Sequence, residues 1–296
     1  MMDLRAMVMG LAFSLMWSSA FATARIIVAD APPLWALTFR FAISGLLAIG
    51  IARAMGQSWH LPGGWRGPQA RAVIILGLCQ NALYLGLNFV AMQWNEASLS
   101  AVIASSMPLI VAAIGYAFRG ERVGTLGMAG LIAGFTGVAM IMSTRIGAGA
   151  DPLGVLYCII AALALAIATQ TVRGASGAGN LLMIVGLQML VGSLTLVGVA
   201  LATETLTVTW TLPLIAAFVY QIVVPGLAAT LLWFSLVNRI GAVRASTFHF
   251  LNPFFGVTIA ALLLGEHIGW LDFAGVAIVA AGILAVQLAR RDTTGE

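Results

Sequence analysis

Long runs of apolar residues follow one another along almost the whole chain, and short breaks rich in Arg, Gly or Pro separate them. A membrane-spanning helix needs about 20 predominantly apolar residues. Ten runs reach roughly this length, at 6–29, 33–53, 71–93, 96–117, 124–143, 152–173, 180–202, 212–237, 241–264 and 270–289. The pattern therefore predicts an all-α integral membrane protein with ten transmembrane helices and short connections.

The composition of the 296 residues supports this prediction and removes several function classes. Hydrophobic residues make up 61% of the chain and charged residues only 8%, whereas a soluble protein has roughly 25% charged residues. All fourteen basic residues are Arg. Without Lys the chain has neither a Walker A phosphate-binding lysine nor an amine for a Schiff base. An ATP-driven pump is therefore not encoded in this chain alone.

The arginines also predict an orientation, because cytoplasmic loops of membrane proteins carry an excess of positive charge. One predicted side carries eleven of them, and the other carries only Arg25 and Arg145. Arg40 falls within the second span. We expect a multi-pass protein of the bacterial inner membrane with both termini in the cytoplasm.

The second half of the sequence repeats features of the first half at a constant offset of 145 positions. Pro108 matches Pro253 at this offset, and Gly120-Glu121 matches Gly265-Glu266. The predicted halves, 1–147 and 148–296, hold five spans each, so an odd number of crossings inverts one half relative to the other. Inverted repeats are typical of transporters that open a central site to each side of the membrane in turn.

The motifs resemble those of a known family. They are the segment MWSSAF at 16–21, Pro33 with Arg40-Phe41, and the repeated pattern Ala97, Pro108, Gly120-Glu121 and Ala242, Pro253, Gly265-Glu266. In these residues the chain resembles the ten-helix EamA-type members of the drug/metabolite transporter superfamily, and among them the YddG-type amino-acid exporters. The resemblance implies two five-helix EamA repeats and export of neutral amino acids, including aromatic ones, Met and Thr.

Polar residues within spans are candidates for a substrate pathway, because lipid offers them no hydrogen-bond partners. They form one stripe on the third span and another on the ninth, and two tryptophans lie in the middle of spans. The predicted substrate-binding residues are Trp17, Gln80, Asn81, Tyr84, Asn88, Trp233, Ser246, His249 and Asn252. The alternative for the amides and hydroxyls is bonding between packed helices, and for the tryptophans it is core packing.

Three further residues have other predicted roles. Arg40 either binds a substrate carboxylate or extends its side chain to the lipid headgroups. Pro108 and Pro253 each free a backbone carbonyl one turn earlier, so we expect the fourth and ninth spans to bend there and act as hinges.

The neutral lining favours amino acids or other small metabolites, because no Asp or Glu lies in the middle of a predicted span. The alternative is a proton-coupled exporter of drugs or aromatic cations. His249 is the one mid-span group that titrates near physiological pH, so it either carries a proton or the protein is a facilitator, which we favour slightly.

Other function classes fit less well. The sequence has no ring of charges typical of a channel filter and no motif typical of an intramembrane enzyme or metal site. We expect no catalytic activity, no cofactor, no metal and no nucleic-acid partner. The expected partners are a small-molecule substrate and the lipid bilayer, and we expect a monomer.

Overall fold

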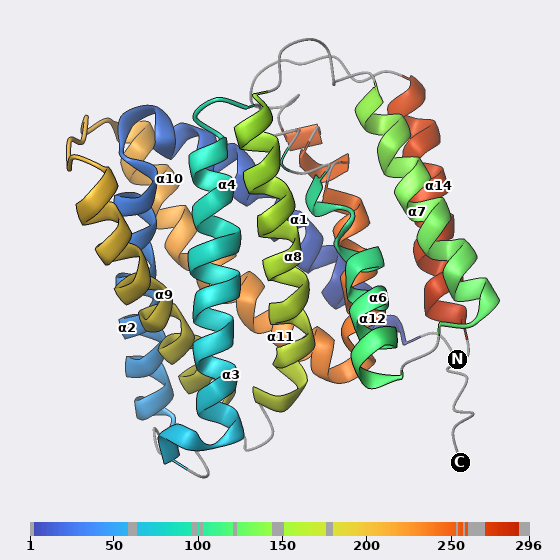
Figure 1. Ribbon diagram of the computed structural model, residues 1–296, viewed down its shortest axis with the longest axis horizontal. Coiled ribbons are helices and arrows are strands. Elements are labelled where there is room, and N and C mark those ends of the chain that lie inside the picture. Colours follow the sequence, from blue (N-terminus) through green and yellow to red (C-terminus); the bar gives the residue numbers. More distant parts are fainter. Residues whose placement is uncertain are drawn as a thin grey trace.

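The computed structural model describes residues 3–58, 64–95, 100, 103–120, 123–143, 151–175, 180–252, 254–256, 258–259 and 270–289. Helices make up most of these residues (Figure 1). The first half contains α1 (Leu4–Asp30), α2 (Pro33–Ala54), η1 (Gly64–Arg66), α3 (Pro68–Leu76), η2 (Gly77–Leu85), α4 (Gly86–Ala91), α6 (Met107–Arg119) and α7 (Thr125–Ser143). The second half contains α8 (Pro152–Ala175), α9 (Leu181–Thr203), α10 (Leu212–Gln221), η3 (Ile222–Ala228), α11 (Ala229–Ile240), α12 (Ala242–Ser246), η4 (Thr247–Leu251) and α14 (Trp270–Leu288).

Six helical segments in the described residues are long and apolar enough to cross a membrane. They are Leu4–Asp30, Pro33–Ala54, Pro68–Ala91, Pro152–Val172, Leu181–Thr203 and Leu212–Ile240. Shorter apolar helices occupy Met107–Phe118, Thr125–Met140 and Phe273–Val286. The helices therefore follow the order and approximate positions of the predicted spans, although the fourth and ninth are shorter or irregular.

The third and eighth spans are each one continuous helix with a π-helical section in the middle. The section η2 separates α3 from α4, and η3 separates α10 from α11. The two sections begin 145 positions apart, at Gly77 and Ile222. Pro225 lies inside η3, where its missing N–H removes one helical hydrogen bond. The wider π turns rotate the residues that follow relative to a regular α-helix, which changes the faces that carry polar side chains.

The fourth and ninth spans are interrupted near their prolines. Helix α6 begins at Met107 after a turn at 105–106, so Pro108 lies in its first turn, where a proline N–H is not needed. In the ninth span α12 passes into the 3₁₀-helix η4, which ends at Leu251. Pro253 lies outside the described residues. The helix is interrupted at 105–106, just before Pro108, and a bend or hinge motion at the two prolines stays a prediction.

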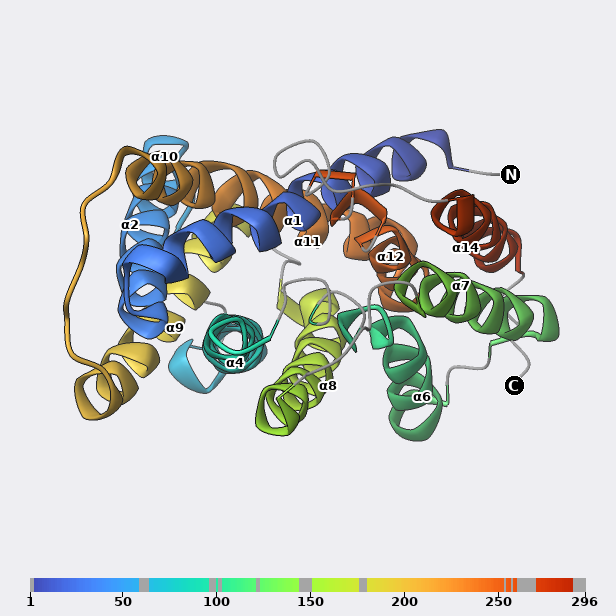
Figure 2. The same ribbon diagram turned by 90° about the horizontal axis from the view of Figure 1, so that it is seen from above.

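Two groups of helices lie on either side of a central region (Figures 1 and 2). One contains α2, α9, α10 and the α3–α4 helix, and the other contains α6, α7, α12 and α14. Helix α1 is strongly tilted and crosses from the second group to the first, with α11 packed along it. We call the end of the bundle where α1 begins the Asp3 end, and the end where it finishes the Asp30 end.

Glycines allow the two most extensive helix pairs, α7 with α14 and α2 with α9, to approach closely. A Cβ atom added at Gly130 would lie 2.7 Å from the carbonyl oxygen of Gly282, and one at Gly137 would lie 2.6 Å from that of Gly275. No side chain fits at these distances. Helix backbones in direct contact are typical of membrane bundles, which gain stability from close packing.

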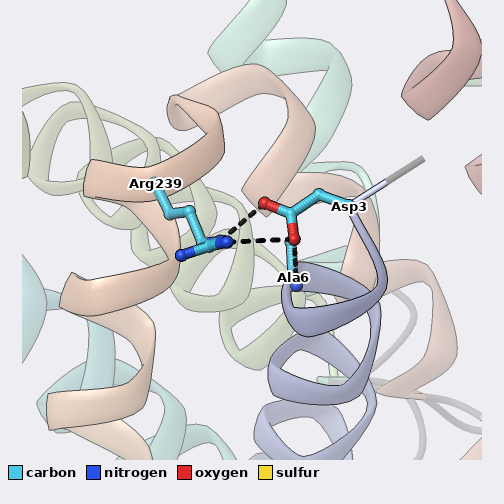
Figure 3. A network of polar contacts seen from close by, with 3 residues as sticks. All are labelled: Asp3, Ala6 and Arg239. Atoms are coloured by element: carbon cyan, nitrogen blue, oxygen red, sulfur yellow. Dashed lines mark hydrogen bonds and ion pairs between the residues drawn. The ribbon is translucent and has the colours of Figure 1, made fainter. Parts of the chain in front are cut away.

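Acidic residues cap two helices and tie them to distant segments. Glu204 accepts hydrogen bonds from the backbone N–H groups of Leu34 and Trp35 and so caps α2. Asp3 accepts a hydrogen bond from Ala6 N at the start of α1 and forms an ion pair with Arg239 of α11 at 2.6 Å (Figure 3). The hydrogen bond from Arg239, followed by that from Ala6, lowers the pKa of Asp3 below its ordinary value of 3.8. The Asp3 end of α1 is thus joined to the end of α11.

Candidate functional site

Five aromatic side chains meet at the centre of the molecule. Phe13 and Trp17 come from α1, Tyr84 from η2, Trp233 from α11 and His249 from η4. Phe13 stacks on Trp233 with ring centroids 4.8 Å apart, and the His249 ring meets Trp233 edge-on at 4.8 Å. All five are buried. We call these five residues the aromatic cluster.

Trp17 lies at the boundary of the aromatic cluster. Its ring is 6.1 Å from that of His249 on one side and stacks at 6.1 Å on that of Tyr84 on the other. Its Nε1–H donates a hydrogen bond of 3.3 Å to the Tyr84 hydroxyl. The bonded N–H and the ring contacts hold the indole in place, so Trp17 forms a wall between the Asp3 end and the Asp30 end of the bundle.

A pocket begins on the other side of this wall. It is lined by Trp17, Ala20, Phe21, Ala24, Arg40, Tyr84, Leu85, Asn88, Phe89, Met92 and Pro225. The α1 residues lie in the second half of their helix and Arg40 in the first half of α2. The pocket, which we call the cavity, therefore lies in the half of the bundle toward the Asp30 end. The space open to a water-sized molecule is about 20 Å³, enough for about one water, so the walls must move apart to admit a substrate.

The cavity combines apolar walls with unpaired polar groups. The Asn88 side chain donates to the backbone oxygen of Tyr84 at 2.7 Å, which leaves its Oδ1 buried without a partner. Arg40 is 3% exposed, and neither its Nε nor its Nη1 has a hydrogen-bond partner. Buried polar groups are normally paired, so these atoms are available to a ligand.

The half toward the Asp3 end is closed where α1 meets the ninth span. Ser14 donates a hydrogen bond of 2.8 Å to the backbone oxygen of Phe248, and Ser18 donates one of 3.3 Å to Asn252 Oδ1. A Cβ atom added at Gly10 would lie 2.3 Å from the Phe248 ring. Gly10, Ser14 and Ser18 are spaced one turn apart, so this face of α1 is a continuous contact surface. We call this contact the seam.

The closed half also contains buried polar atoms without partners. They are Trp233 Nε1, His249 Nδ1 and Asn252 Nδ2. Nearby, Ser246 donates a hydrogen bond of 2.8 Å to the backbone oxygen of Val243 within its own helix. The predicted residues Trp233, Ser246, His249 and Asn252 thus lie together, but on the far side of Trp17 from the cavity.

The predicted stripe on the third span is divided between two environments. Tyr84 and Asn88 line the cavity. Asn81 instead faces α9 and donates to the backbone oxygen and Oε1 of Gln188, at 3.0 and 2.6 Å. Gln80 is buried outside the cavity lining, in a section that packs against α8 and α9. Because η2 is π-helical, positions 80, 81, 84 and 88 do not share the single face that a regular helix would give them.

The sequence reasoning missed several lining residues. Phe21, Phe89, Met92 and Pro225 lie on the cavity wall, and Phe13 belongs to the aromatic cluster. Apolar residues in apolar spans give no signal that separates a cavity wall from a lipid-facing surface. Pro225 did give a signal, since a proline within a span marks a distorted helix.

The described residues contain no group of three His, Cys, Asp or Glu side chains that could hold a metal ion. The chemistry of the site is therefore that of aromatic faces, amides, hydroxyls and one guanidinium.

Known proteins of similar sequence and structure are membrane transporters where their descriptions state a role. The sequence profile of the EamA-like transporter family matches this chain twice, over residues 4–143 and 152–288. The uncharacterized transporter YvbV of Bacillus subtilis is 24% identical over 274 residues, which cover 92% of this chain and 88% of YvbV. The protein PecM of Dickeya dadantii is 24% identical over 90% of this chain and 86% of its own length. A solved crystal structure, 19% identical, covers 98% of this chain and 99% of its own with a TM-score of 0.75, which supports the fold.

Proposed function

The chain belongs to the EamA-like transporter family, and we propose that it is an alternating-access carrier that exports amino acids. Family membership makes it a transporter and not an enzyme, and its long apolar helices make it a multi-pass membrane protein. The observation that carries the proposal is the cavity, which ends at the wall of Trp17 and has unpaired polar groups on both sides of that wall.

Alternating access requires two halves that can exchange roles, and reciprocal contacts support this proposal. The family profile matches each half of the chain once. Gly130 packs on Gly282, and Gly137 packs on Gly275. At the offset of 145 positions Gly275 is the counterpart of Gly130, and Gly282 is the counterpart of Gly137. Such an exchange of partners is expected for two antiparallel helices related by a pseudo-two-fold axis. We therefore propose two inverted five-helix repeats.

In such a cycle each side of Trp17 would be open in one state and closed in the other. In this structure the cavity side holds a small pocket, and the seam closes the side of Trp233, His249 and Asn252. Their unpaired polar atoms can find partners when that side opens to water or substrate, because leaving them unpaired costs free energy. With the termini in the cytoplasm, as the arginine distribution predicts, the structure corresponds to a state closed toward the cytoplasm.

The cavity walls support amino acids as substrates. Trp17, Phe21, Phe89 and Met92 offer apolar and aromatic surface to a side chain, and Asn88 Oδ1 offers an acceptor to an ammonium group. Neutral amino acids, including aromatic ones, Met and Thr, combine these features. The second candidate, a proton-coupled exporter of aromatic cations, is favoured only by the aromatic walls.

We propose that transport is facilitated diffusion, driven by the concentration gradient of the substrate. A proton-coupled carrier needs a titratable group in the pathway, and His249 is surrounded by the rings of Phe13, Trp17 and Trp233. No Asp or Glu lines the described part of the cavity. An amino acid would then leave down its own concentration gradient.

Counterflow in proteoliposomes tests the proposal. Purified protein is reconstituted with unlabelled phenylalanine, methionine or threonine inside, and uptake of the labelled compound is measured with and without a pH gradient. We expect saturable exchange that does not depend on the gradient. Absence of exchange for every amino acid would contradict the proposed substrate class.

A matched pair of tryptophan variants assigns the exchange to the cavity. Trp17→Ala removes the wall between the halves and is expected to abolish exchange. Trp210 is 76% exposed in the segment before α10, so Trp210→Ala should retain it. Equal loss in both variants would contradict a specific role for Trp17.

A further inference from the structure

Arg40 is the only charged side chain on the described wall of the cavity. It lies in the first half of α2, and its guanidinium carbon is 5.3 Å from the centre of the adjacent Phe41 ring. Its Nε and Nη1 are buried and make no hydrogen bond. The side chain therefore has buried donors without an acceptor, next to empty space.

A guanidinium in this position needs an anionic partner. It stays protonated in proteins, so it cannot become neutral on burial as a lysine can. Buried charges in proteins are normally paired, because an isolated ion loses the hydration that stabilises it.

The described acidic side chains that might serve are already engaged elsewhere. Glu204 accepts the first N–H groups of α2, and Asp3 pairs with Arg239 at the other end of the bundle. Asp30 accepts a hydrogen bond from the Thr211 hydroxyl, and Asp151 accepts one from the backbone N–H of Gly154. No acidic side chain among the described residues pairs with Arg40, so a bound ligand can supply the partner.

We propose that Arg40 is the carboxylate-binding group of the cavity and restricts its substrates to small carboxylates with an apolar or aromatic body. This inference rests on the proposed transport function and specifies the group that the site recognises. The planar guanidinium matches the two oxygens of a carboxylate. The body of the substrate then lies against Trp17, Phe21 and Phe89, which line the same cavity.

Asn88 distinguishes amino acids from simple aromatic acids, which both carry a carboxylate. Its unpaired Oδ1 accepts a hydrogen bond from the ammonium group of an amino acid, and a simple aromatic acid leaves it unpaired. Both compounds satisfy Arg40. An aromatic amine without a carboxylate leaves Arg40 unpaired and adds a second positive charge, so the site excludes it.

Three compounds with the same phenyl ring test this assignment on the full-length protein in detergent. They are phenylalanine, 3-phenylpropionate and 2-phenylethylamine, and binding is measured by isothermal titration and by the shift of the unfolding midpoint. We expect both carboxylates to bind, phenylalanine more tightly, and the amine not to bind. If 2-phenylethylamine binds as tightly as phenylalanine, the assignment of Arg40 is wrong.

Arg40→Gln should weaken binding of both carboxylates by about tenfold or more, as expected for the loss of a charge-assisted hydrogen bond. Arg40→Lys keeps the charge and should restore part of the affinity. Arg53→Gln is the matched control, because Arg53 is an exposed arginine near the far end of the same helix. It should leave binding unchanged.

The ligand-free protein gives a readout that a purely structural arginine would not give. Because Arg40→Gln removes an unpaired buried charge, we expect a higher unfolding midpoint without ligand and a smaller rise on adding phenylalanine. A lower midpoint together with unchanged ligand binding would overturn the proposal and assign Arg40 a structural role.

The proposed function and this inference can be contradicted independently of each other. If labelled phenylalanine exchanges in the wild type and in Arg40→Gln with the same affinity, the carrier function stands and the carboxylate assignment is wrong. If 3-phenylpropionate binds through Arg40 while no amino acid binds or exchanges, the carboxylate site stands and the proposed amino-acid function is wrong.

Discussion

The two halves of the pathway contain similar side chains and use them in opposite ways. Toward the Asp30 end, Trp17, Tyr84 and Asn88 line a pocket with about 20 Å³ open to water-sized molecules. Toward the Asp3 end, Phe13, Trp233 and His249 fill the space with their own rings. The difference shows that packing, and not residue type, decides which polar groups a substrate can reach in one state.

Within the closed half, the seam should be the region where an added side-chain atom lowers stability and transport most. Gly10→Ala places a Cβ atom 2.3 Å from the Phe248 ring, and overpacking of this kind costs about 1–3 kcal/mol. We expect a lower unfolding midpoint and reduced exchange. Gly50→Ala is the matched control on α2, because no atom lies within 4 Å of an added Cβ there. An equal change in both variants would contradict the tight packing of the seam.

The break before α6 should affect transport more than stability. Pro108 occupies the first turn of α6, so Pro108→Ala costs the helix little and allows it to extend through the break. We expect several-fold slower exchange with a normal amount of protein in the membrane, and the same for Pro253→Ala. Pro152→Ala, at the start of α8, should change neither quantity. Parallel loss of exchange and membrane insertion would remove the hinge.

A variant of His249 tests whether this residue carries a proton or only packs against its neighbours. Its ring contacts three aromatic rings, and its Nδ1 has no partner. His249→Gln should therefore lower the exchange rate through lost packing without changing its dependence on pH. Exchange rates measured between pH 5 and 8 check this prediction, and a pH optimum that disappears in the variant would establish the proton role.

The smallest effect is expected for the ion pair that joins α1 to α11. Asp3 and Arg239 are partly exposed, and ion pairs at the surface contribute little to stability. Because the pKa of Asp3 is lowered in the folded protein, its stabilising contribution is present above the ordinary pKa and is lost as the pH falls through the lowered value. The difference in unfolding midpoint between the wild type and Asp3→Asn should vanish over that range, and a constant difference would contradict the ion pair.

Much of the helical order could be predicted from apolar runs, because a membrane imposes the length of a span. The offset of 145 positions also relates the glycines at which α7 and α14 meet. Two features escaped prediction. The π-helical section of the third span turns Asn81 toward Gln188 and away from Asn88, and no residue within 77–85 signals it.

The division of the candidate site by Trp17 was also beyond the sequence. Trp17 and Trp233 both lie in the middle of spans, yet one borders empty space and the other is fully packed. Their environments depend on contacts between α1, α11 and the ninth span, which are distant in sequence. Arg40 shows the opposite case, since a charged residue within a span is a functional candidate from sequence alone.

Alternating access is tested most directly by the accessibility of one cysteine in each half. Ala20→Cys lies at a partly exposed position on the cavity wall and Ser246→Cys in the closed half, each in a background with Cys79→Ser and Cys158→Ala. A membrane-impermeant thiol reagent is applied to the outer side of intact cells. We expect it to label Ala20→Cys and to leave Ser246→Cys unmodified. Labelling of both cysteines from the same side, in the same state, would contradict alternating access and indicate a continuous pore.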